Sequence, residues 1–233
     1  MYEDMNSTAD YPMNISREQV SAYVNKVYLW MAATLLITAG VAAYATTSQK
    51  TIAWVAEHMT LMSLGMIGLV LVMSFGASRL TSGALGVLLL TFSAVEGLLF
   101  GPILIIYTQT SVATAFAVTA GMFGVMAVYG AITKRDLSGM GRTLMMMLFG
   151  LIIAGVVNIF WGNGMMQLLT SGIGVVVFAL FTAYDMQNIL KAGLYVTDEE
   201  QRNKGAIMGA LALYLDFINL FLYLLRLLGD RRD

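Results

Sequence analysis

Two aspartates lie where a carboxyl group could exchange a proton or bind a cation. Asp185 lies in the segment FALFTAYDMQNIL and Asp216 in LALYLDFINLFLYLL, and both segments are apolar enough to cross a bilayer. An ionised carboxylate at membrane depth costs several kcal/mol, so it must be protonated, paired or surrounded by water. We therefore interpret these two aspartates as the leading candidates for a functional site.

Both aspartates belong to stripes of mostly small or polar residues that recur at three- and four-residue steps, as on one face of a helix. Such stripes favour close helix packing and place polar groups inside a bundle, away from lipid. One stripe consists of Gly209, Ala212, Asp216, Asn219 and Tyr223, and the other of Ser171, Gly174, Phe178, Thr182, Asp185 and Asn188. The two carboxyl groups are therefore expected to meet.

A carboxyl pair in a dry bundle is expected to hold one shared proton up towards neutral pH, because repulsion and desolvation both disfavour the doubly ionised form. Without that proton the pair could recruit an arginine or bind a hard cation such as Ca²⁺. The nearest candidate is Arg79, at the cytoplasmic end of the second predicted crossing. The alternatives are that Arg79 only sets membrane orientation and that the aspartates only hold helices together.

The sequence also suggests locations or roles for three further polar residues. Glu96, in LLLTFSAVEGLLFGP, is a third acid at membrane depth, which either lines an ion path or accepts hydrogen bonds while protonated. Asn219, one turn beyond Asp216, is a second candidate for the ion path. His58 is expected in an outer loop, exposed to solvent.

The composition predicts an all-α integral membrane protein. The 233 residues are 58% hydrophobic and 12% charged, with a mean hydropathy of +0.76. A helical crossing needs roughly 20 apolar residues, so the length allows about seven crossings and no second domain. Segments of low charge predict them at Val27–Thr46, Thr60–Ser78, Ser82–Tyr107, Val112–Thr133, Thr143–Trp161, Met166–Gln187 and Ala206–Leu228.

The charges and the missing residue types exclude several functions. The net charge of −1 does not favour nucleic acid as a partner. There is no cysteine and only one histidine, so disulfides, iron–sulfur clusters and most metal centres are excluded. We expect no cofactor, and Ca²⁺ only as a transported or bound ion.

Lysine and arginine predict a cytoplasmic N-terminus, since nine of the 13 fall on that side under this assignment and four, including Arg226, Arg231 and Arg232, on the other.

Residues 1–22 are a polar tail, flexible to about Ile15, in which Ser16 and Gln19 have capping-box spacing. Residues 23–229 form the membrane domain and 230–233 a charged tail. We favour seven full crossings over an alternative in which the last segment is a re-entrant hairpin that returns the C-terminus to the cytoplasm.

Four motifs together resemble one family. The ending YLDFINLFLYLLRLLG, the segments FTAYDMQ and EGLLFGPI and the loop TKRDLSG are similar to the Bax inhibitor-1 family, with the loop closest to its bacterial branch. The resemblance extends from about Tyr23 to Gly229. It implies a seven-helix bundle with the last helix central and six helices around it, and a pH-sensitive calcium leak. The family's paired acids map onto Asp185 and Asp216, its latch arginine onto Arg79 and a common acidic position onto Glu96.

The leading hypothesis is a passive, proton-gated cation leak for Ca²⁺ in a bacterial inner membrane, with no reaction catalysed. An intramembrane aspartyl protease is disfavoured, because the chain has LYLD where such enzymes carry GxGD, and it lacks their proline-alanine-leucine element. A third hypothesis is a non-conducting regulator whose polar tail binds partner proteins, such as a membrane protease or cell-death and stress factors.

Overall fold

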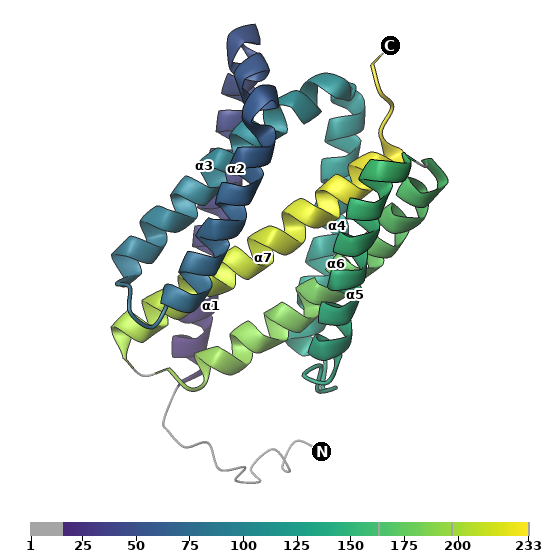
Figure 1. Cartoon of the computed structure of the whole chain (residues 1–233). Coiled ribbons are helices and arrows are strands. Elements are labelled where there is room, and N and C mark those ends of the chain that lie inside the picture. Colours follow the sequence, from purple (N-terminus) through teal and green to yellow (C-terminus); the bar gives the residue numbers. More distant parts are fainter. Residues whose placement is uncertain (1–15, 163, 197, 233) are drawn as a thin grey trace.

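The computed structural model describes residues 16–162, 164–196 and 198–232. Over these ranges the chain forms seven helices long and apolar enough to span a membrane (Figure 1). They are α1 (Arg17–Thr46), α2 (Gln49–Gly76), α3 (Ser82–Ile106), α4 (Gln109–Ile132), α5 (Met140–Trp161), α6 (Gly164–Gly193) and α7 (Glu199–Leu228). The all-α fold and the predicted crossings are confirmed, whereas the expected flexible tail, residues 1–15, lies outside the described residues.

The first two helices begin earlier than the hydrophobic pattern predicts. The Ser16 hydroxyl accepts a hydrogen bond from the Gln19 N–H, and the Gln19 side chain accepts one from the Ser16 N–H. This confirms the capping box, and α1 therefore includes residues 17–22 of the predicted tail. The Ser48 hydroxyl accepts from the Thr51 N–H, so α2 begins at Gln49.

His58 therefore lies inside α2, and its expected place in a loop is wrong. Its ring stacks on Trp54 with centroids 4.6 Å apart, and its Nδ1 is 2.8 Å from the Trp54 carbonyl oxygen. The hydrophobic pattern did not predict the first part of α2, because polar residues around Glu57 interrupt the apolar run. These residues still fit a helix that extends beyond the hydrocarbon layer.

The last segment is one continuous helix of 30 residues. The Asp198 carboxylate caps it by accepting a hydrogen bond from the Gln201 N–H at 2.9 Å. At 1.5 Å per residue the helix is about 45 Å long, which exceeds the roughly 30 Å hydrocarbon core. The re-entrant alternative is therefore wrong, and the start of α1 and the end of α7 lie at opposite ends of the bundle (Figure 1).

Helix α7 is the most buried of the seven helices found in the described residues. In its most apolar stretch 61% of residues are buried, against at most 39% in any other helix. Its principal contacts are with α1, α3, α4 and α6, whereas α2 packs mainly on α3 and α5 on α6. The expectation of six helices ranged around a central α7 is not confirmed by these contacts.

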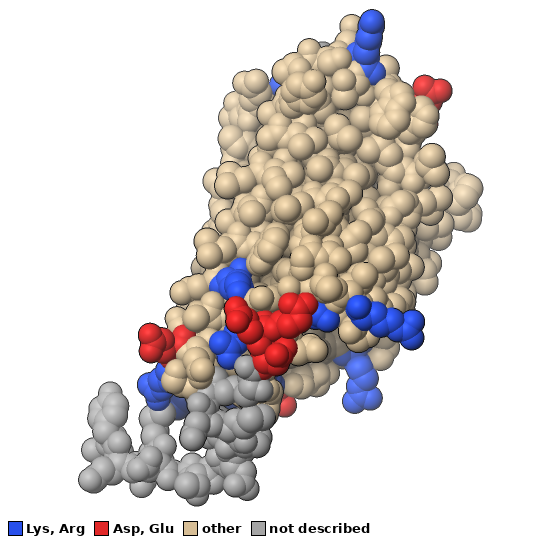
Figure 2. Space-filling view, turned by 90° about the vertical axis from the view of Figure 1, so that its left-hand side faces the viewer, with Lys and Arg blue, Asp and Glu red and all other residues tan. Residues whose placement is uncertain are grey.

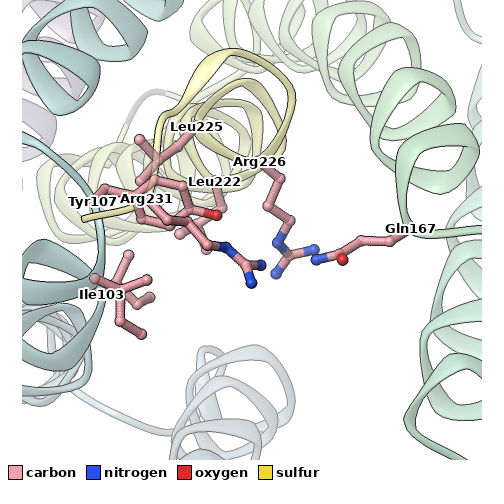
Figure 3. Close-up of a pocket in the computed structure, with 8 residues that line it drawn as sticks. Ile103, Tyr107, Gln167, Leu222, Leu225, Arg226 and Arg231 are labelled. Carbon is pink, nitrogen blue, oxygen red and sulfur yellow. The ribbon is translucent and has the colours of Figure 1, made fainter. Parts of the chain in front are cut away.

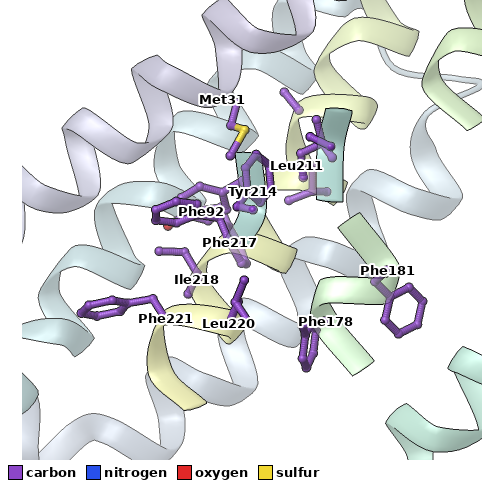
Figure 4. Close-up of a cluster of buried hydrophobic side chains, with 14 of the residues drawn as sticks. Met31, Phe92, Phe178, Phe181, Leu211, Tyr214, Phe217, Ile218, Leu220 and Phe221 are labelled. Carbon is purple, nitrogen blue, oxygen red and sulfur yellow. The ribbon is translucent and has the colours of Figure 1, made fainter. Parts of the chain in front are cut away.

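Aromatic side chains of α7 fill the interior (Figure 4). Tyr214 meets Phe92 of α3 edge to face, with centroids 6.0 Å apart, and Phe217 packs in the same way on Phe123 of α4. Phe221 stacks on Phe100 of α3. These contacts fix the rotation of α7 about its own axis, which decides where its polar side chains face.

Two glycines let neighbouring helices approach closely. A Cβ atom at Gly97 of α3 would lie 2.7 Å from the carbonyl oxygen of Thr38 in α1, and one at Gly130 of α4 would overlap the backbone of Ala183 in α6. Small residues at such crossings are typical of packing in lipid, where close van der Waals contact stabilises helix pairs. Gly97 adjoins Glu96, and Ala183 lies two residues before Asp185.

Exposed charged side chains gather at the two ends of the bundle. On the face shown in Figure 2, Lys, Arg, Asp and Glu gather mainly at the end where α1 begins, and a broad uncharged band separates this end from a few charges at the other. Such a band matches the hydrocarbon layer of a membrane.

Candidate functional site

Asp185 and Asp216 are brought together between α6 and α7, two helices packed along each other. The two carboxyl groups interact by a side-chain hydrogen bond and by charge. Asp216 is buried, with 4% of its surface exposed, and Asp185 is partly buried. Two ionised carboxylates have no hydrogen to donate, so a hydrogen bond between these two groups forms only when one of them carries a proton.

One oxygen of the pair is left without a partner. The Oδ2 atom of Asp216 is fully buried and accepts no hydrogen bond in the described part of the chain. Buried polar atoms are nearly always hydrogen-bonded, because an unpaired one costs about 1–3 kcal/mol. This oxygen can therefore be satisfied by a proton shared with Asp185 or by a cation.

The structure does not bring Arg79 to this pair. Arg79 lies in the short connection between α2 and α3, where its N–H donates to the Gly76 carbonyl oxygen and its side chain is exposed. Among the described residues Arg79 makes no ion pair. The salt bridge found there joins Lys191 to Asp136. The predicted pairing of Arg79 with the aspartates is thus not formed in this conformation.

Glu96 belongs to a different polar cluster. Successive residues of a helix are about 100° apart, so Tyr214 and Asp216 point to roughly opposite sides of α7. On the Tyr214 side, the tyrosine hydroxyl lies 2.7 Å from Thr38 Oγ1, which donates to the Ser93 carbonyl oxygen at 3.0 Å. Since Thr38 has one hydroxyl hydrogen, Tyr214 is the donor in the shorter bond. Glu96 lies one turn beyond Ser93, is partly buried and is close to Tyr214.

Asn219 uses its amide within its own helix. Its Nδ2 donates to the Leu215 carbonyl oxygen at 2.8 Å. The residue lies one turn beyond Asp216 and is partly buried. Its amide oxygen remains the group that could serve the ion path expected from the sequence.

Gln187 connects the aspartate site to the loop between α4 and α5. Its side-chain oxygen accepts a hydrogen bond from the Leu137 N–H, and its Nε2 donates to the Arg135 carbonyl oxygen, both at 2.8 Å. Gln187 is buried and lies two residues beyond Asp185. The TKRDLSG loop is therefore fixed to the end of α6 next to the aspartate pair.

An exposed ion pair completes the attachment of this loop. Asp136 Oδ1 is 2.5 Å from Lys191 Nζ, and it also accepts hydrogen bonds from the Ser138 hydroxyl and N–H. The hydrogen bond from Lys191, followed by those from Ser138, lowers the pKa of Asp136 from 3.8 to about 2. Asp136 therefore stays ionised at neutral pH and is not a sensor in that range.

The residues that surround the candidates were not predicted from the sequence. Gln187 lies within the quoted motif FTAYDMQ, and the available signal was an amide side chain in the predicted crossing that carries Asp185. Thr38 and Tyr214 gave no signal, because threonine and tyrosine are common in membrane helices and their partners lie on other helices.

Comparisons with known proteins agree over nearly the whole chain. A family model described as "Inhibitor of apoptosis-promoting Bax1" matches residues 20–233. A protein of Deinococcus radiodurans is 43% identical over 217 residues, which covers 93% of each chain. The Escherichia coli protein named "Inner membrane protein YbhL" is 41% identical over 221 residues, covering 93% of this chain and 94% of its own. A protein of Borreliella burgdorferi is 44% identical over 216 residues.

These matches confirm the resemblance drawn from the four motifs, which all lie within the matched residues. The chain is a multi-pass membrane protein that belongs to the Bax inhibitor-1 family.

Proposed function

We propose that this protein is a passive, proton-gated cation leak that carries Ca²⁺ and catalyses no reaction. The observation that supports this most directly is the Asp185–Asp216 contact, in which one buried carboxyl oxygen lacks a partner. Stability alone does not explain two acids in contact at membrane depth, since apolar residues would pack there without any desolvation cost.

The proposed switch is the gain or loss of the proton shared by the pair. With the proton present, the hydroxyl of one carboxyl group donates to the other, and the pair carries a single negative charge. Without it, two negative charges face each other in a medium of low dielectric constant, and they repel unless a cation or water enters between them. Either response changes the contact between α6 and α7.

The cation is proposed as cargo rather than as a resident ligand. Ca²⁺ takes six to eight oxygen ligands, and the pair supplies two carboxyl groups. Within the described residues, no group of three histidine, cysteine or acidic side chains could hold a metal ion. Water must therefore complete the coordination, which favours passage over tight binding. Glu96 and Asn219 are proposed as further contacts along the path.

The latch role of Arg79 is proposed for a second conformation. In that state the end of α2 would move towards α6 and α7, so that the guanidinium pairs with the deprotonated aspartates. Arg79→Gln should then raise Ca²⁺ flux at the pH at which the wild type is closed. Unchanged flux at every pH would remove Arg79 from gating.

We place the N-terminus in the cytoplasm and the protein in the inner membrane. Nine of the 13 lysines and arginines lie at the end of the bundle where α1 begins, which supports this orientation. Fusing a reporter active only in the cytoplasm to either end tests it, and activity at the C-terminal end would overturn it.

Ca²⁺ entry into proteoliposomes tests the function. Wild-type flux should change with pH, and Asp185→Asn and Asp216→Asn should each remove that change, because asparagine keeps the shape but has no proton to exchange. Asp136→Asn is the matched control, since it removes an exposed acid near the same end of α6 and should leave the pH profile intact. Wild-type vesicles that are no more permeable than empty ones would refute the leak, and an unaltered profile in both aspartate variants would refute the gate.

The regulator hypothesis places function in the polar tail. Residues 1–15 lie outside the described part of the chain, so deletion of the tail is the test of this alternative. Deleting them should leave flux in liposomes unchanged if the leak is the function, and should abolish capture of a partner protein if the tail supplies the contact.

A further inference from the structure

A cavity at the end of the bundle where α7 finishes is lined by two arginines and by no acidic residue. It has a volume of about 250 Å³ and lies between the ends of α3 and α7 and the first turn of α6. In Figure 3 the side chains of Arg226 and Arg231 extend towards the same space, and the amide of Gln167 approaches Arg226. The remaining wall is formed largely by isoleucine and leucine side chains.

Contacts within the chain hold the backbone around Arg231 and the side chain of Arg226. The segment after α7 is bound to the connection between α3 and α4, since the Thr108 N–H donates to the Asp230 carbonyl oxygen at 3.1 Å and the Arg232 N–H to that of Ile106 at 2.8 Å. These bonds flank Arg231 on both sides. The guanidinium carbon of Arg226 lies 5.3 Å from the centre of the Tyr223 ring, a cation–π distance.

The charge of this pair is not balanced within the described chain. The salt bridge found there, Lys191–Asp136, lies at the other end of α6, and neither Arg226 nor Arg231 makes an ion pair. Two guanidinium groups that face one cavity repel each other unless an anion lies between them. The planar fork of arginine donors fits phosphate oxygens, and the amide of Gln167 supplies a further donor.

We propose that Arg226 and Arg231 bind a phosphate group in this cavity, that of a phospholipid headgroup at the membrane surface. The position supports a lipid source, because Arg226 is in the last turn of a spanning helix and the apolar wall continues towards the hydrocarbon layer. Inorganic phosphate from solution has the same chemistry, and the experiment separates the two. The site is independent of the Asp185–Asp216 pair.

Native mass spectrometry of protein extracted from phosphatidylglycerol vesicles tests the proposal. The double variant Arg226→Gln/Arg231→Gln should retain roughly tenfold less lipid, since each lost charged hydrogen bond weakens binding severalfold or more. The matched control is Lys50→Gln/Arg232→Gln, which removes two charges at the same end, where Arg232 lines a different cavity. Equal thermal unfolding midpoints establish that both variants are folded.

The outcomes separate as follows. Loss of lipid in the first variant alone supports a headgroup site. Binding of inorganic phosphate to the lipid-free protein, detected by phosphorus NMR and lost in that same variant, supports the phosphate site filled from solution. Equal retention in the wild type and the arginine variant, or equal loss in the control, overturns the proposal.

Discussion

The buried polar groups on the two sides of α7 differ in their hydrogen-bond partners. On the side of α1 and α3, the Tyr214 hydroxyl donates to Thr38, which donates to the carbonyl oxygen of Ser93. On the side of α6, Asp216 meets another acid, and its Oδ2 atom has no partner in the described chain. In the first arrangement every hydroxyl group has a partner, while in the second a buried carboxyl oxygen is satisfied only if a proton or a cation is added.

This difference separates structural from functional polar groups. A completed hydrogen-bond network holds helices together and does not respond to pH, because tyrosine and threonine do not titrate near neutrality. An acid pair with an unused oxygen costs stability and changes with pH. The pH switch is therefore expected on the Asp216 side, whereas the hydrogen bonds between Tyr214, Thr38 and Ser93 are expected to stabilise the fold.

Placing a methyl group at the two glycine contacts should give the largest effects. Gly130→Ala would push α4 away from Ala183, two residues before Asp185, and Gly97→Ala would push α3 away from Thr38. Each should lower the free energy of unfolding by about 1–3 kcal/mol through overpacking. Only Gly130→Ala should alter the pH response of Ca²⁺ flux. Gly121→Ala, where a Cβ atom meets nothing within 4 Å, is the control. An equal change of pH response in both variants would contradict the separation of the two sides.

Removing the Thr38 hydroxyl tests the structural side. Thr38→Val leaves the buried Tyr214 hydroxyl without its acceptor and should cost about 1 kcal/mol, measured as a lower thermal unfolding midpoint in detergent. Thr119→Val is the matched control, because the buried Thr119 hydroxyl bonds only to the Ala115 carbonyl oxygen of its own helix. The pH response of flux should persist in both variants. Its loss in Thr38→Val would place the tyrosine network in the gate.

Gln187→Leu should release the loop between α4 and α5. The Leu137 N–H loses its acceptor and the Arg135 carbonyl oxygen loses its donor. Hydrogen exchange at Leu137 should accelerate roughly tenfold, as expected when an interaction of about 1.4 kcal/mol is lost. Gln109→Leu, at the other end of the bundle, should leave this amide unchanged. Unchanged exchange in Gln187→Leu would show that the loop is held by other contacts.

Asp136→Asn should have the smallest effect on stability. This effect should not depend on pH near neutrality. The pKa of Asp136 is lowered from 3.8 to about 2, so its stabilising contribution is complete above about pH 4 and is lost as the pH falls towards 2. The difference in unfolding midpoint between wild type and variant should therefore be constant between about pH 5 and pH 8. A difference that varies across this range would show that the loop ion pair takes part in pH sensing.

Much of this molecule could be predicted from local patterns. Apolar length predicts the seven helices, and the Ser16–Gln19 spacing predicts the first cap. The meeting of Asp185 and Asp216 follows from stripes on two consecutive helices. Contacts between distant helices could not be predicted, because the Thr38–Tyr214 bond joins residues 176 positions apart and depends on the rotation of α7. The family's latch arginine was assigned to Arg79 from its position at the end of the second helix. That position did not determine what the Arg79 side chain contacts.

Infrared spectroscopy of the protein in lipid can detect directly whether Asp185 and Asp216 share one proton. A protonated carboxyl group has a carbonyl stretching band distinct from that of a carboxylate, and Glu96→Gln as background removes the third buried acid. We predict one such band in this background, disappearing over the pH range in which Ca²⁺ flux changes and altered by either Asp185→Asn or Asp216→Asn. No protonated band, or one unaffected by both substitutions, would show that Asp185 and Asp216 do not share a proton.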